Sequence, residues 1–199
     1  MPTFSRRTKA IAAFLIVIAV GYGVALYWES RNKVPSDFTA ARLQSAIIAQ
    51  NIVNNSNQST ATLEKINQDD QQGNYTDALT LTNSLVSQSQ DLRNQAVDLS
   101  NQVENMTRSL SGVNDFDAQQ AALEAISSRL AVINQLVNYS GDLGKLLNVL
   151  QARFSGTPGA GTNAQVEAQV NQINTDVNAI NNFNAQAGQA MDKFDSIEK

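Results

Sequence analysis

Side chains at alternating spacings of four and three residues form long series in this chain. The clearest series contains Leu85, Ser89, Leu92, Ala96, Leu99, Val103, Met106 and Leu110. A second contains Val166, Val170, Ile173, Val177, Ile180, Asn184, Ala187, Met191 and Phe194. This alternation places one stripe of side chains along an α-helix, and it is typical of helices that pack side by side at a small angle. The pattern therefore predicts an all-α fold built from long helices.

Breaks in the pattern divide the chain after Pro35 into four predicted helices, at about 36–71, 75–110, 115–154 and 163–196. Gly73-Asn74 and Ser111-Gly112 form short links, and residues 155–161 form the one clear loop. The first helix has its apolar positions at Phe38, Ala41, Ile48, Ile52, Leu63 and Ile66. For the third, we expect core positions at Phe116, Leu123, Ile126, Leu130, Ile133, Val137, Leu143, Leu147, Leu150 and Phe154.

Short links force consecutive helices to run antiparallel. Residues 36–199 are therefore expected to form one up-down-up-down, coiled-coil-like bundle of four helices. The alternative is an extended antiparallel coiled coil that completes its core in a dimer, because the apolar stripes are narrow.

Residues 10–28 form the most apolar stretch of the chain, with nineteen residues and no charge. A helix of roughly 20 apolar residues crosses a bilayer. Arg6, Arg7 and Lys9 precede this stretch, while Tyr27 and Trp28 lie at its far end, where aromatic side chains favour the membrane interface. We expect a single-pass anchor in the cell membrane. Residues 1–9 would then form a cytoplasmic tail, residues 29–35 a connector, and residues 36–199 an extracytoplasmic domain.

Three other interpretations of the apolar stretch remain open. It could be a signal peptide cleaved after Gly23-Val24-Ala25, since small residues precede the cut in such peptides. It could be a twin-arginine export signal that begins at Arg6-Arg7. It could also be a buried core helix, although no other segment is apolar enough to surround it.

Composition excludes several classes of function. Residues 34–199 carry 9 basic and 17 acidic side chains, and this acidic balance disfavours nucleic acid as a partner. The chain has no cysteine and no histidine, so it lacks thiol chemistry, the commonest general base and the commonest transition-metal ligand. We interpret the acidic clusters as helix caps and solvated faces: Asp69-Asp70, Asp115 with Asp117, and Asp192, Asp195 and Glu198. No catalytic residue, metal site or cofactor is expected, and the chain is not predicted to be an enzyme.

Residues 54–62, Asn-Asn-Ser-Asn-Gln-Ser-Thr-Ala-Thr, interrupt the apolar pattern of the first helix. When the chain is folded back at its links, Ser89 falls level with Gln135, and Asn184 falls near Ile133. Polar residues would then meet at one height, as a polar waist across the bundle: Asn55, Ser59, Ser89 and Asn184. The waist is interpreted in three ways, as a small-ligand pocket or hinge, as a layer that fixes helix register, or as local disorder of the first helix.

We predict a scaffold or interaction protein, because the chain combines a membrane anchor with a helical bundle and lacks the residues of common catalytic sites. With 22 Asn and 19 Gln, its helical surface is rich in neutral amides. The expected partners are the lipid bilayer, through residues 10–28, and another envelope protein or a second copy, through the helices. The alternative function is a ligand-binding, sensor-like bundle that needs a partner to transmit a signal.

Overall fold

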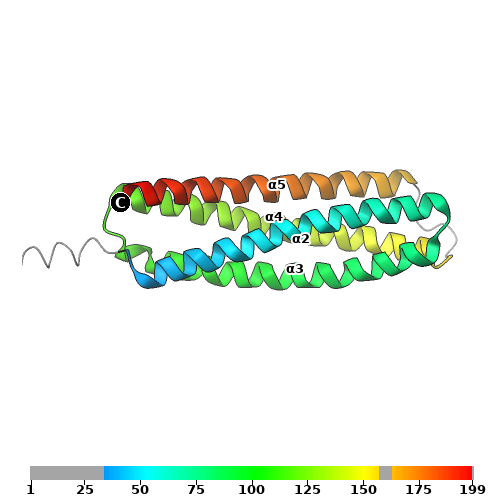
Figure 1. The fold of residues 1–199 in the computed structure, drawn as a ribbon, viewed down its shortest axis with the longest axis horizontal. Coiled ribbons are helices and arrows are strands. Elements are labelled where there is room, and N and C mark those ends of the chain that lie inside the picture. The colour runs from blue at the N-terminus through cyan, green and yellow to red at the C-terminus, as the bar shows by residue number, and fades with distance from the viewer. Residues whose placement is uncertain (1–33, 157–162, 199) are drawn as a thin grey trace, which may run out of the picture.

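A computed structural model of the protein describes residues 34–156 and 163–198. Within these residues the fold consists of four long α-helices and no strand (Figure 1). They are α2 (Ser36–Gln72), α3 (Tyr75–Ser109), α4 (Phe116–Phe154) and α5 (Asn163–Ile197), with one 3-10 turn, η1 (Leu110–Gly112), between α3 and α4. The predicted all-α class and the four helices are therefore confirmed.

The helices form an elongated bundle in which each runs antiparallel to the next (Figure 1). Two ion pairs fix the arrangement at its ends. Arg42, early in α2, pairs with Asp195, late in α5, at 2.5 Å, so α5 returns beside the start of α2. Asp70, late in α2, pairs with Arg153, late in α4, at 2.6 Å, so these two helices run in the same direction.

Local chemistry explains where the helices end. Gly73 has φ 76°, in the left-handed region that glycine adopts without a steric penalty. This conformation lets the amides of Gly73 and Asn74 donate to the carbonyls of Asp70 and Asp69 at 3.1 and 2.8 Å, which closes α2. Before α4, the Asp115 carboxylate accepts from the amide of Ala118 at 2.9 Å and caps the helix.

Residues 54–62 are helical throughout, as part of α2. Ser56 and Ser59 are fully buried there, although neither side chain is apolar. The hydroxyl of Ser59 donates to the carbonyl of Asn55 at 2.9 Å, within the same helix. The stretch is therefore a polar segment of a packed helix, and the hypothesis of local disorder does not describe it.

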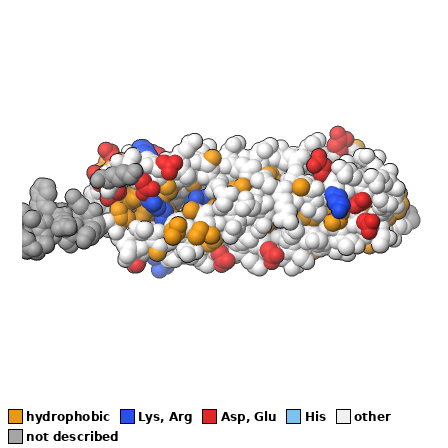
Figure 2. Space-filling view, in the orientation of Figure 1, with side chains coloured by type: hydrophobic (Ala, Val, Ile, Leu, Met, Phe, Trp, Pro, Cys, Tyr) orange, Lys and Arg blue, Asp and Glu red, His pale blue; other side chains and the backbone are white. Residues whose placement is uncertain are grey.

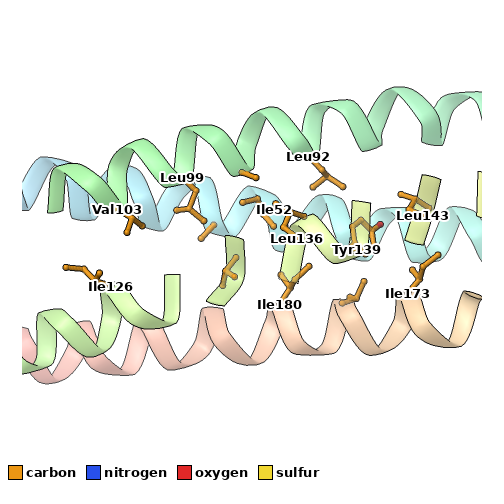
Figure 3. Packing of buried hydrophobic residues seen from close by; sticks show 14 of the residues in the cluster. Ile52, Leu92, Leu99, Val103, Ile126, Leu136, Tyr139, Leu143, Ile173 and Ile180 are labelled. Carbon is orange, nitrogen blue, oxygen red and sulfur yellow. The ribbon is translucent and has the colours of Figure 1, made fainter. Parts of the chain in front are cut away.

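The two longest alternating series point inward as expected. In α3 every member from Leu85 to Met106 is buried, and only Leu110 is partly exposed. In α5 the members Ile173, Val177, Ile180, Ala187 and Phe194 are buried. The other four, Val166, Val170, Asn184 and Met191, are partly exposed. Figure 3 shows the result, a single row of interlocked side chains along the axis, with Leu92 and Leu99 of α3 across from Ile173 and Ile180 of α5.

The expected core of α4 is wrong at four positions, whereas Ile126, Leu143, Leu147 and Leu150 are buried as expected. Four of the residues placed in the core are exposed: Phe116, Leu123, Leu130 and Val137. The buried face instead contains small residues, and its first half consists of Ala118, Ala121, Ala122, Ala125, Ile126, Arg129 and Val132. Alanine lets two helix backbones approach closely, because the interaxial distance depends on the side chains at the contact. Close packing at the start of α4 thus depends on small side chains, and Phe116, Leu123 and Leu130 are left outside.

Chain entry into the bundle is fixed by one close contact. A Cβ atom at Gly112 would lie 2.5 Å from Cγ of Pro35, so only glycine leaves room for the proline ring. At the same end, the rings of Phe38 in α2 and Phe194 in α5 lie 5.3 Å apart between centroids. The start of α2, η1 and the end of α5 therefore share one end of the bundle.

None of the described helices has an apolar stretch long enough to cross a membrane. The predicted anchor, residues 10–28, lies outside the described residues, as do its flanking residues Arg6, Arg7 and Lys9.

Candidate functional site

The four residues of the predicted polar waist take part in two groups of polar contacts at neighbouring heights of the bundle. Asn181 of α5 donates to Asn57 of α2 at 3.4 Å, so Asn184, three residues further along the antiparallel α5, lies nearly level with Asn55. Ser59 in α2 and Ser89 in α3 are buried, with exposures of 0% and 5%. Asn55 and Asn184 are partly exposed. Asn184 contacts Arg129 of α4, whereas Ser59 lies 3.5 Å from the side-chain oxygen of Gln88 in α3. No hydrogen bond joins the two groups in the described part of the chain.

Tyr139 of α4 is the centre of the first group. Its side chain is fully buried in the apolar core, beside Leu136 and opposite α5 (Figure 3). Burial raises the pKa of the Tyr139 hydroxyl to about 12. The nearby Ser59 hydroxyl lowers this pKa somewhat, and the Asp176 carboxylate raises it. Neither completes a hydrogen bond, and the Tyr139 Oη has no hydrogen-bond partner among the residues that the structure describes. We call Ser59, Tyr139 and Asp176 the Tyr139 layer.

Asp176 of α5 is the charged member of the Tyr139 layer, with an exposure of 1%. Two amides donate to its Oδ1, from Gln135 at 2.7 Å and from Gln172 at 3.0 Å, whereas its Oδ2 has no partner within residues 34–156 and 163–198. Burial is the main cause that raises the pKa of Asp176, and the neighbouring carboxylate of Asp142 adds to it. The carboxylate is thus held in place by two neutral amides, without a cation.

Arg129 of α4 is the centre of the second group. It is 5% exposed, and its Nη1 donates to Oδ1 of Asn184. Burial lowers the pKa of Arg129 to about 10, because the charged form loses its hydration. No carboxylate pairs with it in the described residues, so a neutral amide is the group that compensates a buried cation.

Sequence reasoning missed Arg129, Tyr139 and Asp176. Arg129 and Tyr139 lie on a regular series of four and three in α4, which runs through Ala118, Ala122, Ala125, Arg129, Val132, Leu136, Tyr139, Leu143, Leu146 and Leu150. That series is the signal that could have identified both. Asp176 directly precedes Val177 of the α5 series, and no pattern in the sequence marks it as buried.

One residue of each acidic cluster has a structural partner. Asp70 and Asp195 form the two ion pairs at the ends of the bundle, and Asp115 caps α4. No group of three potential metal-ligating side chains occurs in the described residues. The Tyr139 layer combines the carboxylate of Asp176 with the hydroxyls of Ser59 and Tyr139.

A surface cleft lies between α2 and α5 at the end of the bundle far from Pro35. Its volume is about 670 Å³, which is within the range of small-ligand pockets. Its walls combine apolar side chains with a polar rim that includes the Arg153–Asp70 ion pair. The apolar lining consists of Leu63, Ile66, Leu150, Phe154, Val166 and Val170.

Neither a known protein family, nor a curated protein, nor a solved structure matches this chain. The functional argument therefore depends on the geometry of the bundle and on the sequence.

Proposed function

We propose that the protein is a membrane-anchored helical scaffold that holds an interaction surface outside the cytoplasm. One observation supports this most. The bundle is a rod whose chain enters at one end, at Pro35 against Gly112, only six residues after the apolar stretch 10–28. With 37 residues in α2, the far end stands roughly 55 Å from that point, at about 1.5 Å per residue.

The surface of the rod also favours contact with other proteins. Charges are few over the middle of the face shown in Figure 2, where most side chains are neutral and polar. Neutral amides can bind other helices without selecting for charge. No concentration of basic groups accompanies them, and the described domain carries the acidic balance that disfavours nucleic acid.

The membrane topology of the chain provides the first test. Because the chain has no cysteine, a single introduced cysteine is the only thiol that a reagent can label. In Thr3→Cys the thiol precedes the anchor, and in Asn74→Cys it lies at the far turn of the rod. Both full-length variants should remain in membranes washed with alkaline carbonate. In intact cells a membrane-impermeant maleimide should label Asn74→Cys, and it should label Thr3→Cys only after permeabilisation.

Three outcomes would contradict the proposal. Release of the chain by carbonate refutes the anchor, and the opposite labelling pattern refutes the orientation. A mature protein that begins at Leu26 shows that the apolar stretch is a cleaved signal peptide.

The α2–α5 cleft supports a second candidate function, the binding of a small molecule with an apolar body. A thermal melt of the bundle, residues 34–199, in the presence of small-molecule extracts separates the two candidates. A melting temperature that rises with extract in the parent, but not in a variant that fills the cleft, Val170→Phe, favours ligand binding.

A further inference from the structure

The outer face of α4 carries four large apolar side chains at intervals of seven residues. Phe116, Leu123, Leu130 and Val137 have exposures of 76%, 51%, 51% and 61%. Seven residues are close to two helical turns, so the four side chains form one straight stripe. From Phe116 to Val137 the stripe is about 32 Å long, at about 1.5 Å per residue. The described residues contain no other exposed apolar series of this length.

The stripe is half of a heptad seam. Between its apolar members stand neutral residues, at spacings of four and then three: Gln120, Ser127, Asn134 and Gly141. This is the same alternation as in the buried series of α3 and α5. The outer face of α4 therefore has the pattern of a coiled-coil surface, although none of the described helices covers it. We call these eight residues the outer seam.

We propose that the outer seam binds the outer seam of a second copy, with the two α4 helices parallel and in register. In a parallel two-fold pair, each seam residue meets its own counterpart, so any charge would face a like charge. The outer seam contains none, whereas α4 carries Asp117 and Glu124 directly beside it. Asn134 occupies the heptad position at which a single asparagine favours a parallel, in-register pair.

The parallel orientation rests on the proposed function, because two rods anchored in one membrane stand in the same direction. The size of the surface fits this setting as well. Four such side chains expose on the order of a few hundred Å² per copy, so the pair falls below about 1,200 Å² in total, the size of weak and transient interfaces. Confinement to a membrane raises the effective concentration that a reversible contact of this size needs.

Neighbouring residues extend the outer seam at its Val137 end. Val97 of α3 is 61% exposed, and it lines a groove of about 350 Å³ together with Ile133 and Val137. The groove gives side chains of the second copy an apolar place beside the outer seam.

Disulfide trapping of the full-length chain in membranes tests the proposal. Phe116→Cys and Leu130→Cys each place a thiol on the outer seam. Leu43→Cys is the matched control, because Leu43 is 59% exposed but lies on the outer face of α2. Mild oxidation should yield roughly tenfold more covalent dimer from each outer-seam variant than from the control. Adding Leu123→Lys to Leu130→Cys should abolish that excess, with the helical circular dichroism unchanged.

Other outcomes overturn the proposal in distinguishable ways. Equal trapping of all three variants shows random collision. Trapping of Leu130→Cys without Phe116→Cys shows an antiparallel pair, because only a parallel pair brings the two Phe116 positions together. A covalent product with a different protein shows that the outer seam has another occupant. If the chain remains in carbonate-washed membranes but no dimer forms, the pairing is wrong and the anchor stands. If the chain leaves the membrane, the anchor is wrong, and trapping in solution still tests the outer seam.

Discussion

Arg129 is the least expected member of the core, because a buried guanidinium without a carboxylate is costly. The protein compensates it with one amide, that of Asn184, on the facing helix. Such a pair contributes little net stability, yet loss of one partner leaves a polar group buried and unpaired. The pair therefore acts mainly on the register of α4 against α5. The buried guanidinium keeps its hydrogen-bond acceptor only in the register that places Arg129 and Asn184 together.

Asn184→Leu should consequently destabilise the bundle, by about 1–3 kcal/mol, because the buried guanidinium loses its acceptor. Arg129→Met should be neutral or stabilising, and the double variant should recover the loss of the single Asn184→Leu. Urea unfolding of the four proteins, followed by circular dichroism, measures the coupling. A stabilised Asn184→Leu variant would show that Arg129 does not depend on the amide.

The raised pKa of Asp176 leads us to expect that the stability of the fold depends on pH. Its pKa is raised in the folded protein, above the ordinary value of about 3.9 that it has in the unfolded chain. Between these two values the folded state holds a proton that the unfolded state has released. The free energy of unfolding therefore falls as pH rises through this window, and it stays lower above the folded pKa.

Asp176→Asn should remove this contribution. Relative to the parent protein, the variant should gain stability as pH rises from about 4 to 7, since the amide keeps an acceptor for Gln135 and carries no charge. Urea unfolding at several pH values measures the difference. The exposed Asp91→Asn variant controls for the change in net charge. A pH-independent difference between Asp176→Asn and the parent would refute the explanation.

For the helix α4, the sequence pattern predicts the ends correctly but does not identify the buried face. The ends of the four helices lie within one residue of the expected bounds, because Pro35, Gly73 and Asp115 act locally. The buried face of α4 is different, since the helix carries two heptad series. At the start of the helix, the inner series contains alanines and Arg129, whereas the outer one contains the larger apolar residues. Apolar size alone selects the outer series, and only packing against α3 and α5 decides in favour of the inner one.

One pair of substitutions tests this assignment. Leu136→Ala removes a fully buried side chain and should cost about 2–5 kcal/mol. Leu130→Ala is the same change six residues earlier on the same helix, where the side chain is half exposed, and it should cost less than about 1 kcal/mol. Thermal unfolding should be measured at low protein concentration, so that self-association does not contribute to the stability. Equal losses of stability in the two variants would contradict the assignment of Leu136 to the buried face of α4 and of Leu130 to its exposed face.

At the scale of the whole molecule, the order and direction of the helices follow from short links, but their relative heights do not. The fold-back estimate placed Ser89 level with Gln135. In the structure, Arg93 reaches the carbonyl of Ser140 at 3.5 Å, and Gln151 bonds Asn83 at 2.8 Å. These contacts place Ser89 near Leu143. The 3-10 turn and the extended residues before Asp115 change the height at which α4 begins, so α4 meets α3 about two turns away from the expected height.

Entry of the chain at Pro35 beside the end of α5 also has a mechanical consequence. A pulling force between Val34 and Ile197 acts at one end of the rod, across the contact of Phe38 with Phe194. Such a force separates α2 from α5 one helical turn after another, starting at that end, and each step breaks only a few contacts. A force applied between opposite ends would instead shear many turns at once. Tension at the two chain ends is therefore the loading direction in which this bundle yields most easily.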